Sequence, residues 1–109
     1  MPYNEKLAER IRTITKSKHN ITERKMFGGL CFMLSGNMCC GVQQESLMVR
    51  VGPEQYQQCL AEPHAREMDF TGRPLKGMLY ITAEGIRDDQ ALLDWLGLSV
   101  QYVASLPPK

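Results

Sequence analysis

Four cysteines and two histidines are the side chains of this sequence best suited to chemistry. Cys59 and His64 lie close together along the chain. A thiol beside an imidazole is the pairing that a cysteine nucleophile needs, because the histidine takes up the thiol proton. The adjacent Cys39 and Cys40, together with Cys59 and a histidine, would supply the four sulfur and nitrogen ligands of a zinc site. The sequence therefore allows two enzyme-like arrangements, a thiol site and a metal site.

The spacing of the cysteines favours a structural role instead. Cys31, Cys39, Cys40 and Cys59 form no C-x-x-C pair, the usual short ligand loop of a zinc site. Adjacent residues of a strand point to opposite faces, so Cys39 and Cys40 are not expected to bridge each other. We interpret all four as buried, reduced thiols that pack as small apolar side chains, and His64 as a surface residue. We therefore predict no catalytic residue, no metal site and no cofactor.

Length and composition predict one globular domain, residues 1–109. The chain has 43% hydrophobic and 23% charged residues, which is ordinary for a globular protein. No apolar run approaches the roughly 20 residues that span a bilayer. The N-terminal MPYNEKLAER carries charge early, where a secretory signal would have an apolar stretch. We therefore expect a cytoplasmic protein with no membrane segment.

Charge is distributed unevenly, although the net charge is only +1. Residues 1–25 contain seven basic and three acidic side chains, whereas the remainder contains six basic and nine acidic ones. Basic side chains on one surface are what phosphate contacts require, but acids are mixed in here and no aromatic residue is interleaved to stack on bases. We therefore keep nucleic-acid binding as the alternative function. Its candidate contacts are Lys6, Arg10, Lys16, Lys18, Arg24 and Lys25.

Residues 4–18 have the pattern of an amphipathic helix. Leu7, Ile11 and Ile14 recur at spacings of four and three, which places them on one side of a helix. Asn4 is suited to cap the first turn, because its side-chain oxygen accepts a hydrogen bond from an otherwise unpaired backbone N–H.

A run of short apolar segments follows, and it predicts an antiparallel meander. The expected strands are residues 23–27, 30–34, 38–43 and 46–51. Gly36 and Asn37 suit a two-residue hairpin turn because both tolerate positive φ. This turn would place Leu34 opposite Cys39. Both faces of the hairpin are then apolar, so we expect each to be covered by other parts of the chain or by a second subunit.

The second half of the chain predicts a helix, two strands and a longer helix. The expected elements are a helix over residues 53–61, a short strand near residues 67–70, a strand over residues 78–82 and a helix from Asp88 or Asp89 to about Ser105. Pro53 suits the first helical position, because its missing N–H would be unpaired there anyway. The predicted fold is α+β, an antiparallel sheet with the order helix, strands, helix, strands, helix.

The last helix has a broader apolar surface than packing on one sheet requires. One stripe contains Leu92, Leu96, Val100 and Val103, and a second contains Ala91, Trp95, Leu98 and Tyr102. The first stripe is expected to pack on the sheet. Trp95, Leu98 and Tyr102 are therefore the candidate surface for a partner, either another protein or a second copy of this chain in a homodimer.

The run KMFGGLCFML, residues 25–34, contains the adjacent glycines Gly28 and Gly29. A phosphate-binding loop needs other glycine spacings and a helix behind them, whereas this pair opens a strand. We interpret Gly28 and Gly29 as a tight turn or bulge, or as a place where another backbone approaches closely. Gly36 is expected at the next turn.

The combination of these motifs resembles a known family. KMFGGLCFMLSGNMCCGV, LMVRVGPEQY, GRPLKGMLYI and LLDWL, in this order, are similar to the N-terminal domain of the TfoX/Sxy family, the regulators of competence genes. The likeness extends from about Lys25 to Leu96. It implies an α+β, secretion-chaperone-like fold and a role in transcriptional regulation through protein partners, such as the transcription machinery or a second copy of the chain. It implies no catalytic residue.

Two positions depart from the family pattern. Gly52 stands where an acidic residue is common, and Met78-Leu79 stands where Met-Pro is common. Longer members also carry a second, helical domain that these 109 residues do not include. The resemblance therefore implies the properties of the N-terminal domain alone.

Overall fold

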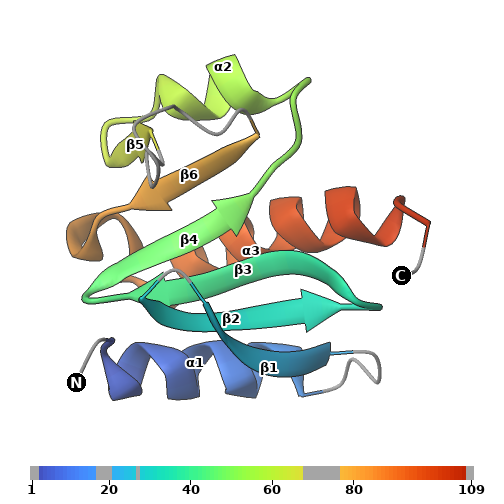
Figure 1. The fold of residues 1–109 in the computed structure, drawn as a ribbon. Helices are drawn as coiled ribbons and strands as arrows, with labels where there is room; N and C mark the ends of the chain where they lie inside the picture. Colours follow the sequence, from blue (N-terminus) through green and yellow to red (C-terminus); the bar gives the residue numbers. More distant parts are fainter. Residues whose placement is uncertain (1–2, 17–20, 27, 68–76, 108–109) are drawn as a thin grey trace.

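A computed structural model describes residues 3–16, 21–26, 28–67 and 77–107, which form a sheet with helices before, between and after its strands (Figure 1). The elements are α1 (Glu5–Thr15), β1 (Ile21–Met26), β2 (Gly29–Leu34), β3 (Asn37–Gln43), β4 (Ser46–Arg50), α2 (Tyr56–Leu60), β5 (Ala65–Glu67), β6 (Met78–Ile81), the 3-10 helix η1 (Ala83–Ile86) and α3 (Asp89–Ala104). This order confirms the predicted α+β fold. Lys18 and most of the strand expected near residues 67–70 lie outside the described residues.

The six strands of the described residues form one antiparallel sheet in the order β1-β2-β3-β4-β6-β5. Helices α1, α2 and α3 contribute their buried side chains to one cluster, which also contains every second residue of β2 and β4. We call this cluster the helix-side core. Among the described residues, no helix is long and apolar enough to cross a membrane.

Helix α1 begins where its cap was predicted. The Asn4 side chain accepts from the Leu7 backbone N–H at 3.0 Å. Leu7 and Ile11 are buried as expected, but the third buried position of the stripe is Thr15, and Ile14 is only half-buried. The Thr15 hydroxyl donates to the Ile11 carbonyl at 2.9 Å, so its polar atom is satisfied inside the helix.

The β2–β3 hairpin corrects the predicted turn and register. Its two turn residues are Ser35 and Gly36, with φ of 52° and 84°, and Leu34 pairs with Asn37 instead of Cys39. Two successive positive φ values are what a tight hairpin turn requires. Asn37 belongs to the strand because its buried side-chain amide donates to the Pro107 carbonyl at 3.0 Å.

A β-bulge in the same hairpin reverses the expectation for the adjacent cysteines. The register shifts between Phe32 and Met33, so that Phe32 pairs with Cys40 while Met33 pairs with Met38. Cys39 is the extra residue, and a bulge turns two neighbouring side chains toward one side. Cys39 and Cys40 consequently both pack in the helix-side core, and the prediction that they point to opposite faces is wrong.

The opposite face of the sheet is also buried, as the apolar hairpin predicted. Cys31, Met33, Met38 and Met48 form a second cluster there, which we call the sulfur cluster. Cys31 and Met48 are fully buried. Strand residues that pair directly share a face, and Cys31 and Met48 both pair with Gly41. The described helices all contribute to the other cluster.

The double glycine has the structural role that its position predicts. Gly28 has φ of +73° in the turn between β1 and β2. Gly29 opens β2 so close to β3 that a Cβ atom there would lie 2.0 Å from the Val42 carbonyl oxygen. Gly28 therefore makes the turn, and Gly29 permits the close backbone approach.

The later helices differ from prediction at single positions. Helix α2 begins at Tyr56, and Pro53 lies in the preceding turn instead of at the first helical position. The Asp88 side chain caps α3, as expected. Ser99 is buried in place of Val100, because its hydroxyl donates to the Cys39 carbonyl across the core.

Two glycine-to-alanine changes should have opposite effects on stability. Gly29→Ala is expected to lower the free energy of unfolding by at least about 2 kcal/mol, since β2 and β3 must separate to admit the methyl group. Gly97→Ala is expected to raise it by about 0.5–1 kcal/mol, because alanine favours a helix and nothing lies within 4 Å of the position. Urea denaturation measures both. Equal stability of Gly29→Ala and the unmodified protein would contradict the close approach.

Candidate functional site

A groove of about 390 Å³ lies between α2, the turn that follows it, η1 and α3. Its apolar lining comes mainly from Cys59, Ala91, Trp95 and Leu98. Polar side chains, among them Glu62, His64 and Asp94, contribute the remainder of its wall. Helix α3 positions Trp95 because its neighbours Leu92 and Leu96 are buried in the helix-side core. We call this hollow the α2–α3 groove.

Cys59 and His64, the predicted thiol arrangement, both line the α2–α3 groove. Cys59 is only 5% exposed, and burial raises the pKa of its thiol, with the nearby Glu62 raising it further. Among the described residues, no hydrogen bond joins Cys59 to His64. A cysteine nucleophile needs a lowered pKa, so this geometry brings the two residues to one place without activating the thiol.

His64 is held by packing on the 3-10 helix. A Cβ atom added to Gly85 would lie 2.5 Å from the Cβ of His64, so only glycine leaves room for the histidine at this position of η1. The His64 carbonyl accepts from the Thr82 N–H at 3.0 Å, which ties the α2–β5 turn to the end of β6. Among the described residues, no three histidine, cysteine, aspartate or glutamate side chains lie close enough to hold a metal ion.

The predicted partner surface divides into two parts. Trp95 and Leu98 are half-buried in the α2–α3 groove. Tyr102 instead packs over Gly52, where a Cβ atom would lie 2.5 Å from its ring, and the Arg50 guanidinium lies 5.7 Å from the ring centroid. The glycine that departs from the family pattern at position 52 therefore accommodates an aromatic ring. All three candidates pack against the helix-side core, but Tyr102 does not line the α2–α3 groove.

The sequence as a whole was compared with known families and proteins. The family model of the TfoX N-terminal domain matches residues 14–103. The chain belongs to this family. The matched span contains the whole sheet and all residues of the α2–α3 groove, and it confirms the resemblance predicted from the motifs. No curated protein matches the chain.

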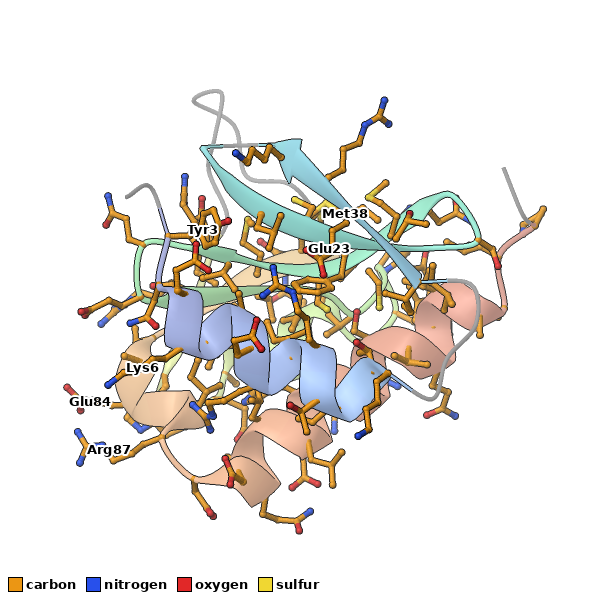
Figure 2. All side chains as sticks on the ribbon, turned by 90° about the horizontal axis from the view of Figure 1, so that it is seen from below. Tyr3, Lys6, Glu23, Met38, Glu84 and Arg87 are labelled. Carbon is orange, nitrogen blue, oxygen red and sulfur yellow. The ribbon has the colours of Figure 1, made fainter. Side chains whose placement is uncertain are left out.

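The basic residues of this TfoX N-terminal domain point in several directions. Lys6 and Lys16 lie near opposite ends of α1, and both are exposed. Figure 2 shows Lys6 directed outward at the same end of the molecule as Glu84 and Arg87. Arg24 and Lys25 are exposed neighbours on β1, so their side chains leave opposite faces of the strand.

Arg10 is the candidate nucleic-acid contact with the most partners inside the chain. Its guanidinium donates to the Ile86 carbonyl at 2.7 Å and to the Asp89 carboxylate at 3.0 Å. It thereby joins α1 to the beginning of α3. Sequence reasoning missed this role because Arg10 and Asp89 are 79 residues apart and no local pattern connects them.

Arg12 makes a second connection that the sequence did not predict. Its guanidinium donates to both carboxylate oxygens of Glu23, at 2.7 and 2.9 Å, and also pairs with Glu9 one turn earlier in α1. Figure 2 shows Glu23 directed from the sheet toward α1. The hydrogen bond from Arg12 lowers the pKa of the Glu23 carboxyl. This bidentate pair attaches α1 to the edge strand β1.

The thiols of the native protein should react slowly with Ellman's reagent. A raised pKa leaves Cys59 with less thiolate at pH 7 than free cysteine has, and all four cysteines are buried. We expect no fast-reacting thiol in the folded protein and four after unfolding in guanidinium chloride. A Cys59 that reacts faster than free cysteine, identified by its loss in Cys59→Ala, would contradict this assignment.

The Arg12–Glu23 pair should make stability depend on pH in the acid range. Because the folded state lowers the pKa of Glu23, the stabilisation is complete above the unfolded pKa of about 4.3 and is lost as pH falls through the folded value. Glu23→Gln is expected to cost up to about 1 kcal/mol at pH 7, since the pair is partly exposed, and progressively less as pH falls through the folded pKa of Glu23. Thermal unfolding across pH measures the difference. Glu9→Gln is the control, with a smaller effect at every pH because its carboxylate is more exposed.

Proposed function

We propose that this domain is a non-enzymatic regulatory module that binds a protein partner in the α2–α3 groove and acts in the cytoplasm in transcriptional regulation. The observation that carries the proposal is the groove itself, an open hollow in which Trp95 and Leu98 are only half-buried. Membership of the TfoX N-terminal domain family supports the regulatory setting.

The groove has the features of a peptide-binding surface. Tryptophan is among the residues that contribute most to binding energy in protein interfaces, especially in a hollow that excludes water. Trp95 and Leu98 lie one turn apart on α3, so a partner contacts both at once. The helix that bears them is packed on the sheet through Leu92 and Leu96, so the surface is formed before binding.

The charge around the groove indicates the chemistry of the partner. Glu62 and Asp94 are exposed acids in its wall, and no lysine or arginine is among the described residues that line it. A partner segment with one or two large apolar side chains flanked by lysine or arginine would match both the lining and the charge. Such a segment belongs to a component of the transcription machinery or to a second copy of this chain.

The chemistry of the groove favours binding over catalysis. The thiol of Cys59 has a raised pKa, and no group in the described residues activates it. Efficient thiol catalysis at neutral pH requires the thiolate. The arrangement of Cys59, His64 and Glu62 is therefore interpreted as part of the wall of a binding groove.

Nucleic-acid binding is the second candidate, and the concentration of basic residues near the N-terminus favours it. Exposed Lys6, Lys16, Arg24 and Lys25 are available for phosphate contacts. Their side chains project from the surface in different directions. Arg10 already donates hydrogen bonds to the Ile86 carbonyl and the Asp89 carboxylate. This function predicts an affinity for DNA or RNA that falls steeply as salt concentration rises.

Capture of partners from the native host tests the docking proposal. The unmodified domain is expected to retain a specific protein after nuclease treatment, and Trp95→Ala is expected to weaken that binding about 30-fold or more, as loss of an interface hot spot does. Leu93→Ala is the matched control, because Leu93 lies on the same helix, is 47% exposed and does not line the groove. Circular dichroism confirms that each variant folds.

Two outcomes would contradict the proposal. One is a strict monomer, by mass in solution, that captures no protein. The other is a partner whose binding survives Trp95→Ala but is lost with Leu93→Ala. A partner that disappears on nuclease treatment would favour the nucleic-acid function instead.

A further inference from the structure

The sulfur cluster has a composition that sets it apart from the rest of the interior. All four of its buried members, Cys31, Met33, Met38 and Met48, carry sulfur. The helix-side core, on the other face of the same strands, is built from leucine, isoleucine, valine, aromatic, alanine and cysteine side chains, and no methionine is among its buried described residues. Buried methionine is therefore confined to one face of the sheet in the described part of the chain.

Strand pairing brings these sulfur-bearing side chains together. Met33 and Met38 pair directly across β2 and β3, and neighbours of this kind have Cβ atoms about 5 Å apart. Met78 packs against the cluster from β6, one diagonal step from Met48.

Gly41 leaves the space in which Cys31 and Met48 meet. It pairs with both residues, from the middle of three adjacent strands. A Cβ atom at Gly41 would lie 2.9 Å from the Met48 methyl carbon and 3.1 Å from the Cys31 Cα. The Met48 side chain therefore folds over the bare backbone of Gly41, and it packs in the same buried cluster as Cys31.

Branched aliphatic side chains would fill this face of the sheet at a lower entropic cost. Methionine loses more rotamer freedom on burial than leucine or valine, and it specifies a core less well. The helix-side core shows that the same strands fill their other face with branched aliphatic side chains. What the four residues share is sulfur, which differs from a hydrocarbon group because it can donate a lone pair to a soft metal ion.

We propose that the sulfur cluster is a binding site for copper(I), with the Cys31 thiolate and the thioethers of Met33, Met38 and Met48 as ligands. Soft thiolate and thioether donors favour copper(I), whereas magnesium and calcium favour oxygen donors. As the ion binds, the Cys31 thiol gives its proton to solvent and a sulfur–copper bond forms, while each thioether donates a lone pair. The ion keeps its oxidation state throughout.

Charge balance also favours a monovalent ion at this position. One thiolate and one copper(I) ion together carry no net charge, and the thioethers are neutral. A net charge left in a buried site would be strongly unfavourable. A divalent ion would leave one uncompensated positive charge among Met33, Met38 and Met48. The site lies on the face of the sheet opposite the helices that form the α2–α3 groove, so this proposal does not depend on the docking function.

A competition experiment tests the site. The reduced 109-residue chain is titrated under anaerobic conditions into the coloured copper(I) complex of bicinchoninate, and loss of colour reports transfer of the ion to the protein. We expect one copper(I) ion to bind per chain. The Met33→Leu/Met38→Leu double variant should bind copper(I) with at least about tenfold lower affinity, because removing even a residue that only supports a metal ligand lowers metal affinity by about that factor. These substitutions conserve volume, so the variant should fold.

Cys59→Ala is the matched control, because it removes a buried thiol from the other side of the sheet, and it should leave copper(I) affinity unchanged. Cys31→Ala should weaken binding at least as much as the double variant, and bound copper(I) should raise the melting temperature of the unmodified protein but not of the double variant. Failure of the unmodified protein to withdraw copper(I) from the chelator would overturn the proposal. Full affinity in the double variant would also overturn it, since the ion would then lie on thiols elsewhere.

Discussion

The alternation of side chains in β2, β3 and β4 is the constraint on which the remaining structure depends. Successive residues of a strand point to opposite faces, and in these strands both sets are apolar, from Leu30 and Phe32 on one face to Cys31 and Met33 on the other. Water must therefore be excluded from both faces of the sheet. Helices α1, α2 and α3 satisfy this requirement on one face, and their placement creates the α2–α3 groove. The position of the candidate site thus follows from the burial that the sheet requires.

Local patterns predicted the elements of this fold better than their pairing. One short segment contains both the helical spacing of the buried Leu7 and Ile11 and the capping residue Asn4, and the structure confirms both predictions. The hairpin register was wrong because Ser35-Gly36 and Gly36-Asn37 are both able to form the turn, and the contact between Asn37 and Pro107 that favours the first lies 70 residues away. The bulge that turns Cys39 and Cys40 to one side has no local signal either.

The same limit applies to the site. The broad apolar surface of the last helix indicated Trp95 and Leu98 as candidate partner-binding residues. Helical periodicity alone was enough to separate their stripe from the stripe that packs on the sheet. The separation of Tyr102 from the other two depends on its packing over Gly52, a contact between distant segments. Sequence spacing suggested Cys59 with His64, but it did not place either residue on the groove that contains Trp95. Burial, which sets the pKa of the Cys59 thiol, is a property of the assembled fold.

The contact of Arg10 with the Ile86 carbonyl and with Asp89 has a consequence for the order of events during synthesis. The first helix depends for this anchor on Asp89, which the ribosome adds 79 residues after Arg10. The Asn37 side-chain amide similarly has no Pro107 carbonyl to donate to until Pro107 has been synthesised. A nascent chain therefore carries its meander out of the exit tunnel with the helix-side surface still uncovered by α3, and the domain closes only after the segment that contains α3 has been synthesised. A ribosome that stalls before this segment is complete would leave a chain whose helix-side surface is available to chaperones.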